Sequence, residues 1–353
     1  EYMRENENRE RSLMYEPTRQ SMDFYHGVKL ALDSLAQSGL NVSLIIYDTA
    51  RDTVALRKIC ENLEFSELDL IIGPTENVEL VGRYAKKYRI PMVCPVAYSN
   101  RVLLDNPFIF KMIGSASVMA DKASQFIVNN YKDQNIIIID GKGKSDIGIV
   151  KAYKKYLNRY LMKETGTKDS VKVLAMDYFT MKTLEGHINP LKKNVIVIPT
   201  NDFAYVSVAM SNLNKYLARY NHKTIEVIVF GTEDWLKMEE IDVTYKLRAQ
   251  VHIPSPSLVD YDTLQTQQLI RSYRNDYKTD PDKYALMGFD ISYFWLAGYL
   301  KYGIDFNAMV TQYDLDLVQT GMRFMRLNET SGYLNSNVYM LKYENYKLIP
   351  QKQ

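Results

Sequence analysis

Residues 135–151 read NIIIIDGKGKSDIGIVK: an apolar strand candidate, a loop of small and charged residues, and the start of an amphipathic helix. Four consecutive isoleucines suit a strand that is covered on both faces, because neither face then has to present polar residues to water. After the loop, Ile149, Tyr153 and Leu157 recur at the spacing of one helical face. The stretch therefore predicts a β-α unit, the building block of a parallel sheet.

Much of the chain repeats this alternation of short apolar runs and helical segments. The other strand candidates are VSLIIYD (42–48), DLIIG (69–73), PMVCPV (91–96), VKVLAMDY (171–178), NVIVIP (194–199) and IEVIVFG (225–231). Between them lie amphipathic segments, such as residues 24–35 and 203–217. Parallel strands need such crossover connections, so we expect an α/β fold with doubly wound parallel sheets covered by helices.

Two departures from this alternation bear on the domain organisation. The first helix, at about residues 18–37, follows only the polar residues 1–20, so we expect its strand to lie upstream of residue 1. After Phe230 long helical segments replace the alternation, and the chain closes with hairpin-like RFMRLNETSGYLNSNVYMLKY (323–343). Such a late excursion is typical of a chain that leaves one domain and returns to another.

Composition and charge exclude several classes of protein. The 353 residues are 46% hydrophobic, and the net charge of +2 from 44 basic and 42 acidic residues gives no general attraction to nucleic acid or an anionic membrane. The length suggests two domains, and no apolar run approaches the ~20 residues that cross a bilayer. Cys60 and Cys94 leave two alternatives open, a disulfide or two buried thiols.

The loop DGKGKSD (140–146) resembles the end of a phosphate-binding Walker A loop. Its residues 143–145 match the last three positions, but the required first glycine falls on Ile138, inside the strand, so the loop is too short to wrap a phosphate. A helix N-terminus still offers free amide groups. Two interpretations stay open: a polar or anionic ligand near Lys142 and Ser145, or a simple helix cap.

Signatures of catalysis are missing from the sequence. No GxGxxG follows a strand, no GxSxG occurs, and the four histidines stand far apart, without metal-ligand spacing to each other or to a cysteine. We therefore expect no metal, no cofactor and no enzymatic activity.

Ligands of open α/β sheets bind outside the carboxyl ends of the strands. The loops at these positions share small and polar residues. They are residues 73–75, 96–100, 140–145, 199–203 and 231–235. Glu233 comes just after the last strand candidate of this series, a position that favours a ligand contact over an ordinary solvated loop. Such loops suit hydrogen bonding to a ligand rather than bond breaking.

A resemblance emerges from the order of the segments. FYHGVKLALDSL, LNVSLIIYDT, DLIIGP, IPMVCPVAYSN, NIIIID, IEVIVFGTEDW and YALMGFDISYFW follow one another as in type I periplasmic binding proteins. The chain resembles the branched-chain amino acid binding branch of that family over nearly its whole length. It is similar in particular to divergent Bacteroidetes members that carry such a module beside peptidoglycan-binding LysM repeats.

The resemblance implies two Rossmann-like lobes joined by a three-crossover hinge, with a small ligand in the inter-lobe cleft and closure of the lobes on binding. Lobe one would comprise residues 1–114 and 253–325, and lobe two residues 115–252 and 326–353. It also implies a periplasmic or membrane-anchored extracytoplasmic location. A membrane permease or a peptidoglycan-associated protein is the expected macromolecular partner.

The resemblance assigns ligand contacts to named residues. Thr75 lies in the loop after the second strand of lobe one. Tyr98, Ser99 and Asn100 match the loop that grips an amino acid carboxylate, although Tyr98 stands where a small or hydroxyl residue is usual. Glu233 matches the acidic residue that accepts the ammonium group.

In lobe two the match to the family is incomplete. The aromatic residue that closes over the ligand falls at Ile147, and the tyrosine after the later strand falls near Phe203, which follows the candidate contact Asp202. Lys142 and Ser145 complete the candidate set. The amino acid site is thus half present.

These observations leave three hypotheses for the function. The first is a non-enzymatic module that binds a small amino acid-like or amide-like molecule. The second is a structural or interaction module of a peptidoglycan-associated envelope protein, with a degenerate pocket. The third is an enzyme built on a similar sheet.

Overall fold

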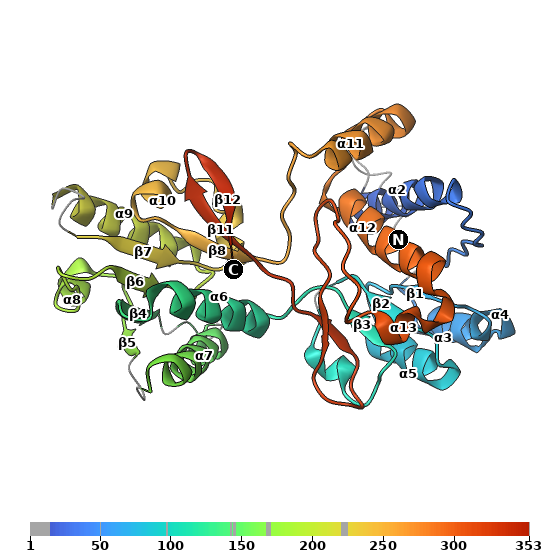
Figure 1. The fold of residues 1–353 in the computed structure, drawn as a ribbon, viewed down its shortest axis with the longest axis horizontal. Helices are drawn as coiled ribbons and strands as arrows, with labels where there is room; N and C mark the ends of the chain where they lie inside the picture. Colours follow the sequence, from blue (N-terminus) through green and yellow to red (C-terminus); the bar gives the residue numbers. More distant parts are fainter. Residues whose placement is uncertain are drawn as a thin grey trace. The chain divides into compact units, whose positions relative to one another are not determined.

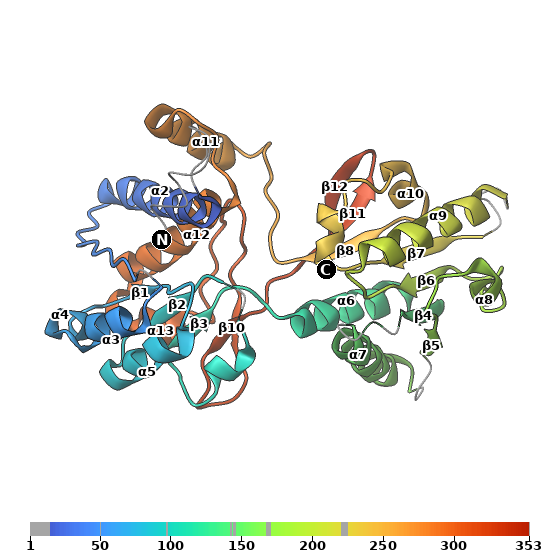
Figure 2. The same ribbon diagram turned by 180° about the vertical axis from the view of Figure 1, so that it is seen from behind.

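The computed structural model describes residues 15–49, 51–96, 98–141, 143, 146–166, 171–219 and 225–352. Contacts between Cα positions divide them into two compact units, drawn in Figures 1 and 2. Unit 1 comprises the described parts of Glu1–Ser115 and Ser257–Asn337, and unit 2 those of Ala116–Pro256 and Val338–Gln353. The chain therefore passes between the units three times.

Unit 1 is built on a five-stranded sheet. Its elements are α2 (Glu16–Ala36), α3 (Thr53–Glu61), α4 (Leu63–Ser66), β1 (Ile71–Ile72), α5 (Val78–Tyr88), β2 (Met92–Cys94), η1 (Asn100–Leu103), β3 (Ile109–Lys111), α11 (Leu264–Tyr277), α12 (Lys283–Tyr302), η3 (Gly303–Asp305), α13 (Phe306–Met309), β9 (Phe324–Arg326) and β10 (Tyr333–Asn335). The strand order is β1-β2-β3-β10-β9, with β9 antiparallel to its neighbour and the other pairs parallel.

Helices α2 and α12 of unit 1 lie side by side (Figures 1 and 2) and meet at two glycines. A Cβ atom on Gly27 would lie 1.9 Å from the carbonyl oxygen of Ala285, and one on Gly288 would lie 2.1 Å from that of Phe24. No side chain fits at either position, so the glycines permit the close approach of the two backbones. Helix α12 also buries Trp295 in the main core of the unit.

Unit 2 is built on a seven-stranded sheet. Its elements are α6 (Ala116–Tyr131), β4 (Asn135–Asp140), α7 (Ile147–Thr165), β5 (Lys172–Ala175), α8 (Met181–Glu185), β6 (Asn194–Val197), α9 (Phe203–Arg219), β7 (Val227–Phe230), η2 (Glu233–Lys237), α10 (Val243–Arg248), β8 (His252–Ser255), β11 (Tyr339–Glu344) and β12 (Lys347–Gln351). The order is β12-β11-β8-β7-β6-β4-β5, with β11 and β12 antiparallel and the rest parallel.

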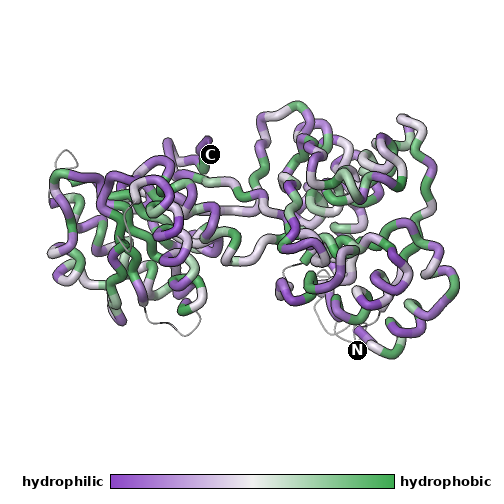
Figure 3. Tube along the Cα trace, turned by 60° about the horizontal axis from the view of Figure 1, so that its bottom comes forward, coloured by the Kyte–Doolittle hydropathy of each residue, from purple (hydrophilic) through white to green (hydrophobic). Residues whose placement is uncertain are grey.

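The isoleucines of β4 pack alternately into two separate cores of unit 2. Ile137 and Ile139 join the core that α9 covers, whereas Ile136 and Ile138 join the core that α6 and α7 cover. This alternation follows from the two-residue repeat of a strand. Figure 3 shows the hydrophobic residues of unit 2 gathered along its strands. The prediction of a strand buried on both faces is confirmed, and with it the α/β class.

The prediction of a strand at residues 42–48 is wrong. Residues 41–49 form neither helix nor strand, and the side chains of Val42, Leu44 and Ile46 are 45%, 44% and 63% exposed. A strand needs a neighbour to accept and donate its backbone hydrogen bonds. Within the described residues no strand pairs with this segment. The β-branched composition of this segment favours a strand. No strand forms because no neighbouring strand shares its backbone hydrogen bonds.

The hairpin-like stretch 323–343 divides between the two units. β9 and β10 form an antiparallel pair on the sheet of unit 1, whereas β11 pairs with β8 and β12 in unit 2. The third passage of the chain consequently follows Asn337, later than the boundary expected after residue 325.

Both cysteines are buried free thiols, which decides between the two alternatives for them. Burial raises the pKa of the Cys60 thiol to about 11, so the thiol stays protonated near neutral pH. In the part of the chain that the structure describes, no helix is both long and apolar enough to cross a membrane.

Candidate functional site

The loops that follow β6 and β7 are joined to each other at the carboxyl edge of the unit 2 sheet. The hydroxyl of Thr232 donates to Oδ1 of Asn201 at 2.6 Å, and the indole Nε1 of Trp235 donates to the carbonyl oxygen of Thr200 at 2.9 Å. Both Thr232 and Trp235 are buried. These two bonds hold the loops in one arrangement at the edge where open α/β sheets bind ligands.

Glu233 is presented by this joined pair of loops. It opens η2 directly after the buried Thr232 and is itself half-buried. The fully buried Trp235 packs so tightly under the loop that a Cβ atom on Gly231 would lie 2.5 Å from its ring. The path of the backbone into Glu233 therefore depends on a glycine at 231 and a tryptophan at 235.

Asp202 and Phe203 have local roles at the start of α9. The carboxylate of Asp202 accepts the backbone N–H of Tyr205 at 3.0 Å, and its own N–H donates to Oγ1 of Thr200 at 3.2 Å. The Asp202 carboxylate thereby satisfies one amide group of the first turn of α9. Phe203 is the first residue of α9 and its side chain is 45% exposed.

The loop after β4 packs against Tyr205, a half-buried tyrosine of α9. A Cβ atom on Gly141 would lie 3.3 Å from the ring of Tyr205, whose hydroxyl donates to the carbonyl oxygen of Met176 at 2.9 Å. Burial, with the nearby charges of Asp140 and Asp177, raises the pKa of Tyr205 to about 12. The phenol is therefore a neutral donor at this edge.

Helix α7 begins at Ile147, with Asp146 at its N-cap position and no cap hydrogen bond from the Asp146 side chain. The backbone N–H of Asp146 donates to the carbonyl oxygen of Gly143 at 2.9 Å. Ile147, the position at which the resemblance implies an aromatic residue, is 47% exposed. Lys142 and Ser145 lie outside the described residues.

In unit 1, four predicted site residues follow β1 and β2, and the last of them, Asn100, is described with Lys111 below. Thr75 is exposed, two residues after Gly73, whose φ of +115° suits glycine. The hydroxyl of Tyr98 donates to a carboxylate oxygen of Glu79 on α5 at 2.5 Å, and this bond raises the pKa of Tyr98. Ser99 accepts the N–H of Arg101 at 3.3 Å and caps η1. Tyr98 and Ser99 are thus engaged with their own unit.

Lys111 is a buried residue at the carboxyl end of β3 that was not among the predicted site residues. Its side chain is 1% exposed, and its ammonium donates to Oδ1 of Asn100 at 2.7 Å. Burial lowers the pKa of Lys111, and no acidic side chain forms an ion pair with it within the described ranges. The sequence feature that could have indicated a buried lysine is its place as the single charged residue in the otherwise apolar FIFKMIG (108–114).

Lys111 fixes the orientation of the Asn100 amide. An ammonium group can only donate, so Oδ1 of Asn100 accepts and Nδ2 must point elsewhere as a donor. The nearest partner of Nδ2 is the Ser115 hydroxyl at 3.4 Å, a long hydrogen bond. Asn100 thus offers a donor, next to a buried positive charge, to a ligand group that accepts.

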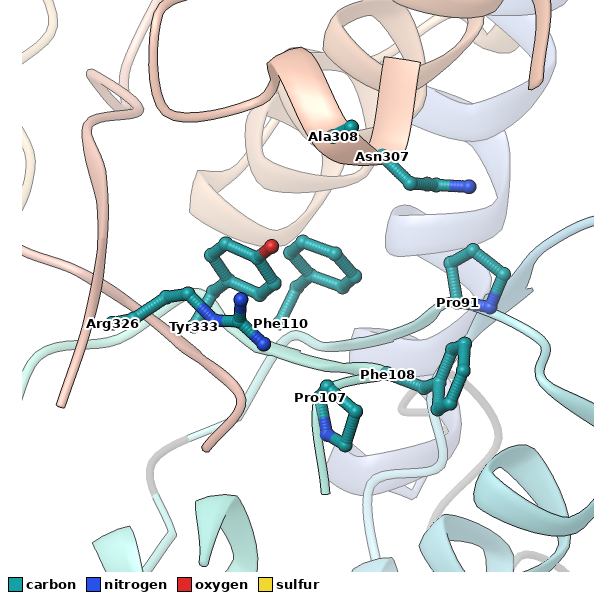
Figure 4. Close-up of a pocket in the computed structure, with 8 residues that line it drawn as sticks. All are labelled: Pro91, Pro107, Phe108, Phe110, Asn307, Ala308, Arg326 and Tyr333. Atoms are coloured by element: carbon teal, nitrogen blue, oxygen red, sulfur yellow. The ribbon is translucent and has the colours of Figure 1, made fainter. Parts of the chain in front are cut away.

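A hollow of about 230 Å³ lies at the opposite, amino end of the unit 1 strands (Figure 4). Its lining comes from segments before or inside β2, β3, β9, β10 and α13. The residues are Pro91, Pro107, Phe108, Phe110, Asn307, Ala308, Arg326 and Tyr333. Phe110 and Tyr333 stack at 4.5 Å, and the guanidinium of Arg326 lies 4.8 Å from the Tyr333 ring centroid. None of the predicted site residues lines this hollow.

No family model and no curated protein matches the sequence. Solved structures do match. A putative branched-chain amino acid ABC transporter from Rhodospirillum rubrum is 13% identical with a TM-score of 0.70, covering 94% of this chain and 95% of that one. An ABC transporter substrate-binding protein from Desulfitobacterium hafniense in complex with Leu is 15% identical with a TM-score of 0.54, covering 93% and 95%.

A further match is the C-domain of LpoA from Haemophilus influenzae, a regulator of PBP1A, at 11% identity and a TM-score of 0.61, covering 94% and 95%. At these identities the likeness concerns the fold, which is that of type I periplasmic binding proteins. The comparisons give no support for the LysM-associated branch.

Proposed function

We propose that the protein is a non-enzymatic extracytoplasmic module that binds a small amino acid-like or amide-like molecule through loops at the carboxyl ends of its parallel strands. The observation that carries this proposal is the loop pair after β6 and β7, joined by the bond between Thr232 and Asn201, which holds Glu233 at that edge. A protein of the same fold has been solved in complex with Leu, which supports the choice of ligand class.

Two loop regions, each within its own unit, carry groups suited to recognising such a molecule. In unit 2, the Glu233 carboxylate would accept hydrogen bonds from an ammonium or amide N–H. In unit 1, Nδ2 of Asn100, oriented by Lys111, would donate to a carboxylate or amide oxygen. The ammonium or amide N–H of amino acids and their amides suits the first group, and their carboxylate or amide oxygen suits the second.

A thermal-shift screen with L-amino acids, their amides and peptidoglycan fragments tests this proposal. We expect at least one compound to raise the melting temperature, and expect Lys111→Met to abolish that rise because Asn100 loses its orientation. Lys87→Met is the matched control, since Lys87 is exposed on α5. A screen in which no compound stabilises the protein would argue against the proposal.

A second candidate function is an interaction module of an envelope protein, with a membrane permease or a peptidoglycan-associated protein as partner. It is favoured by the engagement of Tyr98 with Glu79 and by Ile147 in place of an aromatic residue. The likeness to the LpoA C-domain, described as a regulator of PBP1A, favours it as well. Specific capture of a purified envelope partner, together with no small-molecule response, would select this candidate.

A further inference from the structure

The hollow at the amino end of the unit 1 strands (Figure 4) lies away from the loops of the proposed ligand site. Pro91 directly precedes β2, and Pro107 and Phe108 precede β3, whereas Asn100 follows β2 at its carboxyl end. Every residue that lines the hollow belongs to unit 1. The hollow is therefore a candidate for a second, separate site within this unit.

The walls of the hollow are apolar and largely aromatic. The stacked rings of Phe110 and Tyr333 form one side, and Pro91, Pro107 and Phe108 lie around the other (Figure 4). A cavity of roughly 150 Å³ can hold benzene, so the volume of about 230 Å³ has room for one ring with a small substituent. Aromatic rings pack favourably on such walls, by offset stacking or edge to face.

The backbone before β2 and β3 offers little to a ligand. The carbonyl oxygen of Pro91 accepts the N–H of Ile71 at 2.9 Å. That of Phe108 accepts the N–H of Met92 at 2.7 Å, and the N–H of Phe108 donates to Oδ1 of Asn106 at 3.2 Å. The prolines have no N–H to donate. Polar recognition in this hollow therefore depends on side chains.

Arg326 brings a positive charge to the hollow. Its Nε donates to the carbonyl oxygen of Ser331 at 3.2 Å, and its guanidinium carbon lies 4.8 Å from the Tyr333 ring centroid. These contacts hold the guanidinium and leave Nη1 and Nη2 available. Within the described ranges no carboxylate forms an ion pair with Arg326. Such a planar fork suits a carboxylate, which it can bind through two parallel hydrogen bonds.

Asn307, on α13, adds a second donor. Its Oδ1 accepts the hydroxyl of Tyr299 at 3.0 Å, so Nδ2 is left as the donor of this amide. Nδ2 forms only a long hydrogen bond, at 3.4 Å, with the carbonyl oxygen of Ile304. None of the lining residues is acidic. The side chains thus suit a group that accepts hydrogen bonds and offer nothing comparable to an ammonium group.

We propose that this hollow binds a small aromatic carboxylate. The ring would pack among Phe108, Phe110 and the two prolines, and the carboxylate would accept hydrogen bonds from Nη1 and Nη2 of Arg326. Nδ2 of Asn307 would donate to a further acceptor on the ligand. This site differs in place and in chemistry from the proposed amino acid-like site, and it does not rest on the proposed function.

Isothermal titration calorimetry of chain 1–353 with phenylacetate tests this proposal. We expect phenylacetate to bind, and expect phenylacetamide and acetate to bind at least about tenfold more weakly, because the amide lacks the charge and acetate lacks the ring. Absence of phenylacetate binding would overturn the proposal. Equal affinities for acetate and phenylacetate would overturn it as well, since they would show a simple contact between an anion and an exposed cation.

Substitutions place the binding in this hollow. Arg326→Met should weaken phenylacetate binding about tenfold or more, and Arg326→Lys should weaken it less, because lysine keeps the charge but loses the planar fork. The matched control is Arg323→Met, at another exposed arginine of the same segment. Both Met variants should keep the wild-type melting temperature. Equal phenylacetate affinities in Arg326→Met and the wild type would overturn the proposal.

Glu233→Gln separates this site from the proposed function. Phenylacetate has no ammonium group for Glu233 to accept, so its affinity should be the same in Glu233→Gln and in the wild type. A loss of phenylacetate binding in Glu233→Gln would overturn the proposal of a separate site. Binding of phenylacetate in a protein that responds to no amino acid would support this site and leave the proposed function contradicted.

Discussion

Asp290 is the most consequential buried acid of unit 1. It is 0% exposed on α12, and its two carboxylate oxygens accept the backbone N–H groups of Val318, Gln319 and Thr320 at 2.7 to 2.9 Å. These bonds attach the segment that leads into β9 to the core helix. Burial raises the pKa of Asp290 to about 7, against the lowering effect of the three amide donors.

We predict that Asp290→Asn lowers the free energy of unfolding of unit 1 by about 2 to 4 kcal/mol, because an amide nitrogen would face backbone donors. The wild-type unit should also lose stability as the pH rises from about 4 to 7. In that window the folded state binds a proton that the unfolded state has released. Denaturant titrations at pH 5 and 8 with Trp295 as reporter check both points. A variant with the wild-type pH dependence would contradict them.

His252 gives unit 2 the opposite response to pH. The imidazole is 2% exposed, stacks on Phe230 at 4.9 Å and lies 2.7 Å from the Gln250 carbonyl oxygen through Nδ1. Burial lowers its pKa to about 4. The unfolded chain therefore binds the proton first as the pH falls below about 6.5.

We predict that unit 2 loses stability as the pH falls from about 6.5 to 4 and that His252→Phe removes this loss, because phenylalanine keeps the stacking but cannot be protonated. The two tryptophans separate the units, since Trp235 lies in unit 2 and Trp295 in unit 1. In a Trp295→Phe background, fluorescence-monitored urea titrations at pH 7 and 4.5 measure the effect. An equal loss with and without His252 would show that other groups cause it.

At the scale of elements, the loop from β7 into η2 positions Glu233, the predicted site residue on which the proposed function depends. Gly231 leaves space for the ring of Trp235, and Trp235 anchors the loop to Thr200. Gly231→Ala should lower the free energy of unfolding of unit 2 by about 1 to 3 kcal/mol, because the added methyl group collides with the ring.

Gly231→Ala should also weaken ligand binding, because it displaces the backbone that carries Glu233. The matched control is Gly186→Ala, where an added Cβ meets no atom within 4 Å. Denaturant unfolding and binding measurements on both variants check the prediction. Equal effects of the two substitutions would show that the tight contact at Gly231 has no special role.

The sequence predicts correctly those elements whose own residues are enough to determine their structure. NIIIID needs both of its faces covered, and the structure places its isoleucines in two cores. Residues 42–48 carry the same local signal but lack a neighbour, and no local pattern reports that. β3 escaped prediction because its three residues, including a lysine, are too short and too polar to stand out.

The candidate site was predictable only in part, for the same reason. The rule that ligands bind at the carboxyl ends of strands identified the loop that presents Glu233, yet it could not reveal the bond between Thr232 and Asn201 that joins two loops. The role of Lys111 depends on Asn100, eleven positions away, and on burial that composition does not report. Engagement of Tyr98 by Glu79 is equally a tertiary contact.

At the scale of the whole molecule, the chain passes three times between two α/β units, after Ser115, Pro256 and Asn337. The third passage lies later than expected because β10 pairs with β3 and carries β9 with it. This boundary is determined by the pairing of β10 with β3, which lie more than 200 positions apart in the sequence. A local hairpin pattern carries no information about such a pairing. The central claim is the proposal that the protein binds a small molecule at the carboxyl ends of its parallel strands.

Isothermal titration calorimetry on the wild-type protein with L-amino acids and their amides tests that claim most directly, alongside Glu233→Gln and the exposed control Glu239→Gln. We predict that at least one compound binds with a Kd below ~1 mM, about −4 kcal/mol of binding free energy. Its affinity should fall at least tenfold in Glu233→Gln and stay unchanged in Glu239→Gln. Absence of binding heat for every compound, or equal affinities in wild type and Glu233→Gln, would contradict the account.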